Sequence, residues 1–176
     1  MDEALEHLNA LPREALTAEL LKCCGSTRWA QGVSDERPFR DLPRLLDTAE
    51  RVWWRLGRED WLEAFRSHPP IGGKRAARET GEEARRWSEQ EQAGTSGARS
   101  EVLDALADAN RAYQQKFGFI FIVCATGKSA DEMLALLQER LSNDPATELR
   151  IAATEQSRIT RLRLEKLLKK SRESGV

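Results

Sequence analysis

The C-terminal stretch from Asp144 to about Lys170 constrains the fold more than any other part of the chain. The pair Asp144-Pro145 opens the longest helix that the sequence predicts. At about 100° of rotation per residue, one narrow sector of this helix collects mostly apolar side chains: Leu149, Ala152, Gln156, Ile159, Arg163 and Leu167. A helix with such a stripe buries it in a core. The stretch therefore predicts a protein built by helix packing.

Helical periodicity recurs through most of the remaining sequence. We expect helices at 2–10 and 13–24, from 41 to 56, around 61–65, at about 100–117 and at about 129–141. Residues 32–38 should form a loop. Residues 74–87 are almost all charged or small, which predicts an exposed segment and is compatible with a helix. Only 119–125, Phe-Ile-Phe-Ile-Val-Cys-Ala, is β-prone by composition, and it has no evident partner strand. The 176 residues are therefore predicted to form an all-α, single-domain helical bundle.

Charge and composition exclude several classes of function. The formal net charge of −1 steers no charged partner globally, and no apolar run is long enough to span a membrane. In the last helix Arg158 and Arg161 alternate with Glu155 and Glu165, which predicts a solvated face rather than a nucleic-acid surface. Three cysteines and no evident signal peptide predict a cytoplasmic protein without a disulfide framework.

His68 is the side chain best placed for proton transfer. It follows the apolar run 61–65 and precedes Pro69, which disfavours helical dihedrals at the residue before it, so a helix should end at His68. Imidazole is the side chain that exchanges protons near neutral pH. The other histidine, His7, lies in a plain charged helix. With two histidines and no Cys-x-x-Cys pair, we expect no zinc site.

Arg163 places a guanidinium in the middle of the apolar stripe of the last helix. Because an unpaired buried charge is costly, Arg163 needs an anion. One interpretation is a structural ion pair with a carboxylate of the core. The other is that Arg163 binds an anionic substrate, and the helix alone slightly favours the structural pair.

Ser88, Glu91 and Gln92 form a second polar group. The spacing of Ser88 and Glu91 also fits a capping box, in which both side chains would only cap a helix. The functional interpretation is that the three side chains face one ligand, with Glu91 close enough to orient His68. A constrained histidine, an arginine on an apolar face and this cluster together favour a shared pocket.

Several motifs resemble one known family, the decarboxylases of 2-oxo-4-hydroxy-4-carboxy-5-ureidoimidazoline (OHCU). The resemblance runs from about residue 15 to about residue 168, and the order and spacing of its motifs are specific. The motifs are Cys23-Cys24-Gly25-Ser26 with Arg28-Trp29-Ala30, His68-Pro69-x-Ile71-Gly72, Glu91-Gln92-Ala93-Gly94, Asn110-x-x-Tyr113-x-x-Lys116-Phe117-Gly118-Phe119 and Arg161-Leu162-Arg163-Leu164.

This resemblance implies an all-helical, homodimeric enzyme of urate breakdown with no cofactor and no metal. It would convert OHCU, the product of 5-hydroxyisourate hydrolysis, into (S)-allantoin and carbon dioxide. The family's catalytic histidine falls on His68, and Glu91 is the second catalytic group. The substrate-binding positions fall on Pro69, Ser88, Gln92, Ile122 and Arg163.

Two residues depart from the family pattern: Pro70 stands where many members carry Arg or Asp, and Ile120 where many carry Pro. Neither removes a catalytic group, but Ile120 could shift the backbone donors around Ile122. In the expected mechanism, neutral His68 takes a hydroxyl proton while Glu91 orients the imidazole. The alternatives are a decarboxylase or hydrolase of a related ureido or imidazole acid, and a non-catalytic helical interaction module.

Overall fold

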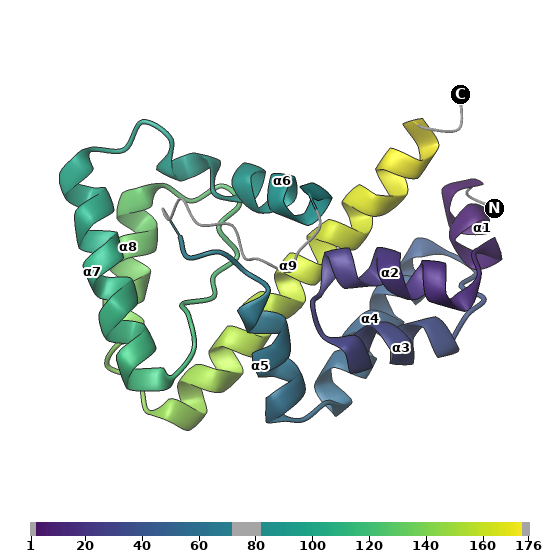
Figure 1. Ribbon diagram of the computed structural model, residues 1–176, viewed down its shortest axis with the longest axis horizontal. Helices are drawn as coiled ribbons and strands as arrows, with labels where there is room; N and C mark the ends of the chain where they lie inside the picture. Colours follow the sequence, from purple (N-terminus) through teal and green to yellow (C-terminus); the bar gives the residue numbers. More distant parts are fainter. Residues whose placement is uncertain (1–2, 72–81, 174–176) are drawn as a thin grey trace. The chain divides into compact units, whose positions relative to one another are not determined.

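The computed structural model describes residues 3–71 and 82–173, with side chains of the last helix described as far as residue 170 (Figure 1). Within these ranges the chain forms helices and no strand, which confirms the all-α prediction. No helix in the described part of the chain is long and apolar enough to cross a lipid bilayer. The elements are α1 (Glu3–Ala10), α2 (Arg13–Cys23), α3 (Thr27–Asp35), α4 (Leu42–Arg55), α5 (Arg58–Arg66), α6 (Glu82–Glu91), the 3-10 helix η1 (Ala93–Thr95), α7 (Ser100–Phe117), α8 (Ala130–Arg140) and α9 (Pro145–Glu173).

The chain divides into two compact units. The first comprises residues 1–64 and 157–176, and the second comprises residues 65–156. Helix α9 therefore contributes its first turns to the second unit and its later turns to the first. The single domain expected from the sequence stays a prediction.

Tryptophans anchor the core of the first unit, where α3 packs against α2 and α4. The Trp29 indole N–H donates to the carbonyl of Ala49 at 3.0 Å, which ties α3 to α4. Gly32 allows the two helices to approach closely, because a Cβ at this position would lie 2.9 Å from a methyl carbon of Val52. The polar edge of the Trp29 ring thus finds a backbone partner while its apolar body fills the core.

The loop predicted at 32–38 is wrong in its first half, because α3 continues to Asp35. Ser26 starts this helix, and its hydroxyl accepts a hydrogen bond from the N–H of Trp29 at 3.3 Å. Glycine normally weakens a helix interior. Here Gly32 is retained inside a helix since the packing against Val52 leaves no room for a side chain.

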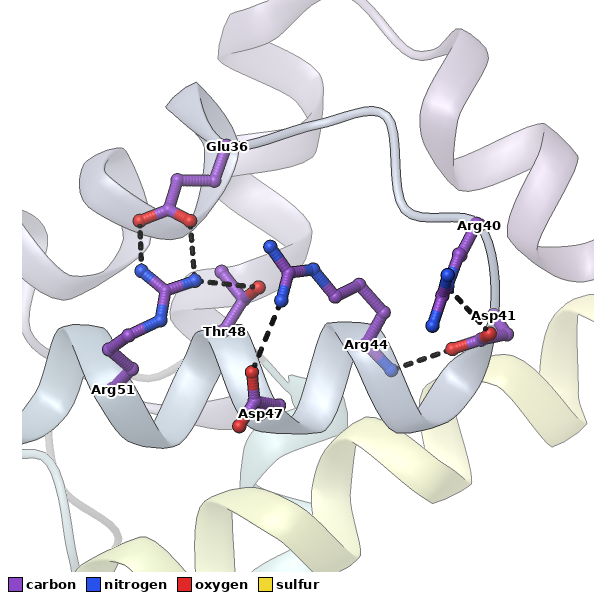
Figure 2. A network of polar contacts seen from close by, with 7 residues as sticks. All are labelled: Glu36, Arg40, Asp41, Arg44, Asp47, Thr48 and Arg51. Atoms are coloured by element: carbon purple, nitrogen blue, oxygen red, sulfur yellow. Dashed lines mark hydrogen bonds and ion pairs between the residues drawn. The ribbon is translucent and has the colours of Figure 1, made fainter.

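Polar contacts on the first unit fix how α4 begins (Figure 2). The Asp41 side chain caps the helix by accepting from the N–H of Arg44 at 2.8 Å. Further along, both terminal nitrogens of Arg51 donate to the carboxylate of Glu36, at 2.8 and 2.6 Å. This bidentate pair joins the residue that follows α3 to the later part of α4.

The second unit is organised around packed aromatic rings on α7 and the segment that follows it. The Tyr113 ring lies 4.6 Å from that of Phe117 and 5.4 Å from that of Phe121, between ring centroids. Helix α8, which packs against α7, begins with the predicted capping box of Ser129 and Glu132. That box is confirmed by both reciprocal hydrogen bonds.

Candidate active site

His68 lies just beyond the end of α5, where the sequence places it. The helix ends at Arg66, and the backbone N–H of His68 still donates to the carbonyl of Phe65 at 3.1 Å. Pro69 follows, and both residues are half-buried. A helix end with proline after it holds the imidazole on a rigid support.

The imidazole of His68 has a partner that sequence reasoning missed. Its Nε2 lies 2.7 Å from Oε1 of Gln156 on α9, and Gln156 is fully buried. An amide oxygen can only accept, so Nε2 carries the proton in this contact. In the neutral ring, Nδ1 is then the basic nitrogen. The sequence feature that could have indicated this contact is the position of Gln156, a polar residue on the apolar face of the last helix.

Ser88 and Glu91 do not form the capping box that their spacing allows. Both lie inside α6, which begins at Glu82 and ends at Glu91. The Ser88 hydroxyl donates back to the carbonyl of Ala84 at 3.1 Å. Both side chains are nevertheless buried, unlike Glu89 and the other charged residues of this helix end. The capping interpretation is therefore wrong, and the two polar groups face the interior.

A glycine just after α6, Gly94, allows the chain there to approach the turn before α8 closely. A Cβ on Gly94 would lie 1.9 Å from the carbonyl oxygen of Lys128, so only glycine fits this approach. Gln92 directly precedes η1, and its carbonyl accepts from the Thr95 hydroxyl at 2.9 Å. The close approach brings the helix that carries Glu91 beside the segment that ends at Ala125.

The thiol of Cys124, in that segment, lies within the electrostatic influence of two carboxylates, those of Glu155 and Glu91. Burial raises the pKa of the Cys124 thiol, and the charges of Glu155 and Glu91 raise it further. Glu155 also accepts a hydrogen bond from the Cys124 backbone N–H at 2.7 Å. The prediction that Glu155 belongs to a solvated face is therefore wrong, because this side chain is buried and holds backbone. The sequence wheel cannot reveal a partner 31 residues away.

Ile122 lies in the extended segment 119–125, buried and without helix or strand. Its carbonyl accepts a hydrogen bond from Nη1 of Arg140 at 2.8 Å. Within the described residues, most backbone N–H groups of the segment 119–125 have no hydrogen-bond partner, those of Ile122 and Val123 among them. Since nearly all buried N–H groups are paired, a segment with such open donors suits a ligand.

Arg163 lies on the later part of α9, in the first unit. It is 3% exposed, and its Nη1 lies 3.4 Å from the carbonyl oxygen of Lys22. Arg161 is 62% exposed in its side chain and pairs with Glu165 at 3.5 Å. The helical wheel therefore assigned the two arginines correctly to buried and exposed faces.

The adjacent thiols of Cys23 and Cys24, near Arg163, are buried in the core. Burial raises the pKa of both, that of Cys24 to about 12, although the charge of Arg163 acts in the opposite direction. At neutral pH both remain protonated, and a thiol is a poor nucleophile compared with a thiolate. In the described part of the chain, no three His, Cys, Asp or Glu side chains cluster in a way that could hold a metal ion.

Six of the seven predicted site residues thus belong to the second unit: His68, Pro69, Ser88, Glu91, Gln92 and Ile122. Arg163 belongs to the first. The structure joins His68 to Gln156, and the contact expected between Glu91 and His68 stays a prediction. A rigid imidazole, a buried carboxylate and open backbone donors are suited to proton transfer on a polar ligand.

Comparison with known proteins identifies the family. The sequence model of OHCU decarboxylase matches residues 9–165. The chain belongs to the OHCU decarboxylase family. This match spans both units and includes every predicted site residue.

Relatives of the OHCU decarboxylase family occur as single enzymes and as parts of larger proteins. The uric acid degradation bifunctional protein TTL of Arabidopsis thaliana is 40% identical over 146 residues, which cover 82% of this chain and 45% of that protein. The chain thus spans less than half the length of that relative. The OHCU decarboxylase of Mus musculus is 31% identical over 139 residues, covering 79% of this chain and 78% of that protein.

A solved structure of the OHCU decarboxylase family has the same fold. The crystal structure of an OHCU decarboxylase in the presence of (S)-allantoin superposes with a TM-score of 0.75 at 38% sequence identity. The superposition covers 86% of this chain and 98% of that one. An (S)-allantoin synthase with 17% identity shares the fold, with a TM-score of 0.70.

Proposed function

We propose that this chain decarboxylates OHCU to (S)-allantoin, a carboxy-lyase step of urate degradation. The family match and the relatives named for this reaction support the substrate. The observation that carries the chemistry is the imidazole of His68 held at Nε2 by the buried amide of Gln156. This contact leaves Nδ1 of a neutral ring as the base, which is the form that a proton-accepting histidine requires.

In the proposed reaction, His68 takes the proton of the substrate's hydroxyl group. The bond between the ring carbon and the departing carboxylate breaks, and carbon dioxide leaves. The electron pair of that bond enters the adjoining imine and carbonyl system of the substrate. The carbon that lost the carboxylate becomes a carbonyl, and a proton adds to one face of the adjoining imine carbon, which bears the ureido group. This proton sets the S configuration. Because the substrate accepts its own electrons, the reaction needs no cofactor.

The remaining predicted residues bind and orient. Glu91 would orient the imidazole of His68, a role supported by its burial at the inner end of α6. Arg163 would bind the substrate carboxylate through its planar guanidinium. Pro69, Ser88, Gln92 and the backbone at Ile122 would hold the ureido group and the ring amides. The partnerless N–H groups at Ile122 and Val123 support this assignment.

Two further proposals concern assembly and compartment. We propose a homodimer on the strength of the family resemblance, and a cytoplasmic location on the strength of three free thiols. Sedimentation of the purified protein measures the first, and fractionation of the source cells measures the second. A monomer at assay concentration, or recovery outside the cytoplasm, would contradict these proposals.

His68→Asn tests the function, with His7→Asn as a matched control on an exposed helical histidine. Freshly made OHCU is mixed with each protein, and (S)-allantoin is followed by circular dichroism and mass spectrometry. General acid–base groups contribute about 10²–10⁴-fold, so His68→Asn should lose that much while His7→Asn keeps wild-type turnover. A wild-type protein that does not outpace spontaneous decay of OHCU would sink the proposal, and so would a fully active His68→Asn.

A further inference from the structure

A buried polar network outside the predicted site connects three helices of the second unit. Arg140 on α8, Glu148 on α9 and Tyr113 on α7 are all buried, and Glu148 is fully so. Nε of Arg140 donates to Glu148 at 2.7 Å, and Asn143 donates to the second carboxylate oxygen at 2.9 Å. The Tyr113 hydroxyl also donates to Glu148. Burial and this hydrogen bond raise the pKa of Tyr113, so the hydroxyl keeps its proton.

Such a network is a poor way to gain stability. Removing two charges from water is energetically costly, and apolar side chains of similar volume often stabilise a core as well or better. The value of Arg140, Glu148 and Tyr113 must therefore lie in the geometry that they impose. The catalytic residues proposed above do not include any of the three.

The geometry is imposed on the extended segment 119–125. The guanidinium of Arg140 lies over the Phe121 ring, 4.5 Å from its centroid, and Nη1 donates to the carbonyl of Ile122 at 2.8 Å. Glu148 holds the other side of the same planar group. The guanidinium of Arg140 thus holds both the Phe121 ring and the Ile122 carbonyl. Only a planar group with several donors can make both contacts.

Fixing that carbonyl also fixes a donor on the opposite side. A trans peptide is planar, and its C=O and N–H point in opposite directions. When Arg140 holds the Ile122 carbonyl, the N–H of Val123 must point away from Arg140. That N–H, like most of those in the segment, has no hydrogen-bond partner among the described residues. Arg140 therefore sets the direction in which an open backbone donor faces.

We propose that Arg140, held by Glu148 and Tyr113, is a positioning residue that aims the backbone N–H of Val123 toward the substrate. This inference rests on the proposed function, because it assigns a purpose to a donor of that site. Arg140 itself does not contact the substrate. Displacing a substrate-holding group by about 1 Å can cost on the order of 10²-fold in rate.

The test compares two changes in the network with a matched control. The triple variant Arg140→Met, Glu148→Leu, Tyr113→Phe makes the network apolar, and Arg140→Lys keeps the charge but loses the fork. Arg111→Lys alters an exposed arginine of α7 that pairs with Asp108. Each protein is measured for Tm, for kcat and KM separately, and for the amide ¹H and ¹⁵N shifts of Ile122 and Val123 without ligand.

We expect both network variants to stay folded, to move the amide signals of Ile122 and Val123, and to lose about 10- to 100-fold in kcat/KM. Arg111→Lys should change none of these. A folded triple variant with wild-type kcat/KM would overturn the proposal, as would unmoved amide signals in Arg140→Lys. If wild-type protein does not decarboxylate OHCU, the proposed function fails, while the amide signals still decide whether Arg140 positions this backbone.

Discussion

Nε2 of His68 lies 2.7 Å from Oε1 of Gln156, although 88 positions separate the two residues in the sequence. The acceptor is a neutral amide, and it is fully buried. It can fix the orientation and the tautomer of the ring as a carboxylate would, but it adds no negative charge that favours the imidazolium. This contact holds the ring in one orientation.

Replacing Gln156 by leucine should misalign His68 without unfolding the protein. The variant loses the acceptor for Nε2–H, so we expect a mixture of tautomers and a fall of about 10-fold or more in kcat/KM. Long-range ¹H–¹⁵N spectra report the tautomer, and His7 provides an internal reference. Gln138→Leu on exposed α8 surface is the control. An unchanged tautomer and unchanged kinetics in Gln156→Leu would contradict the role of this contact.

Arg163→Lys should impair catalysis although it keeps the charge. A bidentate grip on a carboxylate needs the planar fork, which lysine lacks. We expect a clearly lower kcat/KM for Arg163→Lys and near-normal kinetics for Arg161→Ala, whose side chain is largely exposed. Tm and kcat/KM are measured on the same preparations.

The alternative for Arg163 is a purely structural ion pair. In that case Arg163→Lys would lower Tm and leave the activity per folded molecule intact. A crippled Arg161→Ala would instead show that the assignment of the two arginines to substrate binding and to solvent is wrong.

Gly94→Ala should destabilise the second unit. Its Cβ would meet the carbonyl oxygen of Lys128 at 1.9 Å, and backbone atoms cannot move aside cheaply. Overpacking of this kind costs about 1–3 kcal/mol. Gly57→Ala is the control, since nothing lies within 4 Å of a Cβ there. Urea unfolding of both variants measures the difference, and equal midpoints would refute the close approach.

Glu36→Gln should lower stability only above mildly acidic pH. The hydrogen bond from Arg51 lowers the pKa of Glu36 below its ordinary value of 4.5. A lowered folded-state pKa stabilises the protein above 4.5, and the gain is lost as pH falls through the folded pKa. Wild type and variant should therefore converge in acid. Thermal melts between pH 3 and about pH 7 check this, with Glu50→Gln as an exposed control; a constant gap across that range would contradict it.

Local periodicity was enough to predict most helices and the two faces of α9. The stripe that holds Gln156, Ile159 and Arg163 is buried as expected, because a wheel depends only on residues a few positions apart. The capping box of Ser129 is equally local and was confirmed. Features set within one or two turns of a helix can be predicted from the sequence.

Contacts between distant segments could not be predicted in this way. Glu155 was assigned to solvent because its neighbours on the helix are charged, yet its partner is the backbone of Cys124. Ser88 and Glu91 matched a capping pattern, yet the helix begins before them. The fork of Arg140 joins residues from separate elements, and no spacing in the sequence reveals it.

The extended segment 119–125 also bears on whether the protein aggregates when it unfolds. Its sequence, Phe-Ile-Phe-Ile-Val at 119–123, is uncharged, β-prone and free of proline, which is the composition of segments that self-associate as cross-β assemblies. In the native chain, charged side chains from Arg140, Lys128 and Glu155 hold its backbone groups. When unfolding breaks these hydrogen bonds, the freed backbone N–H and C=O groups can pair with another copy of the segment. Heating past the melting transition should therefore end in precipitate that does not redissolve on cooling.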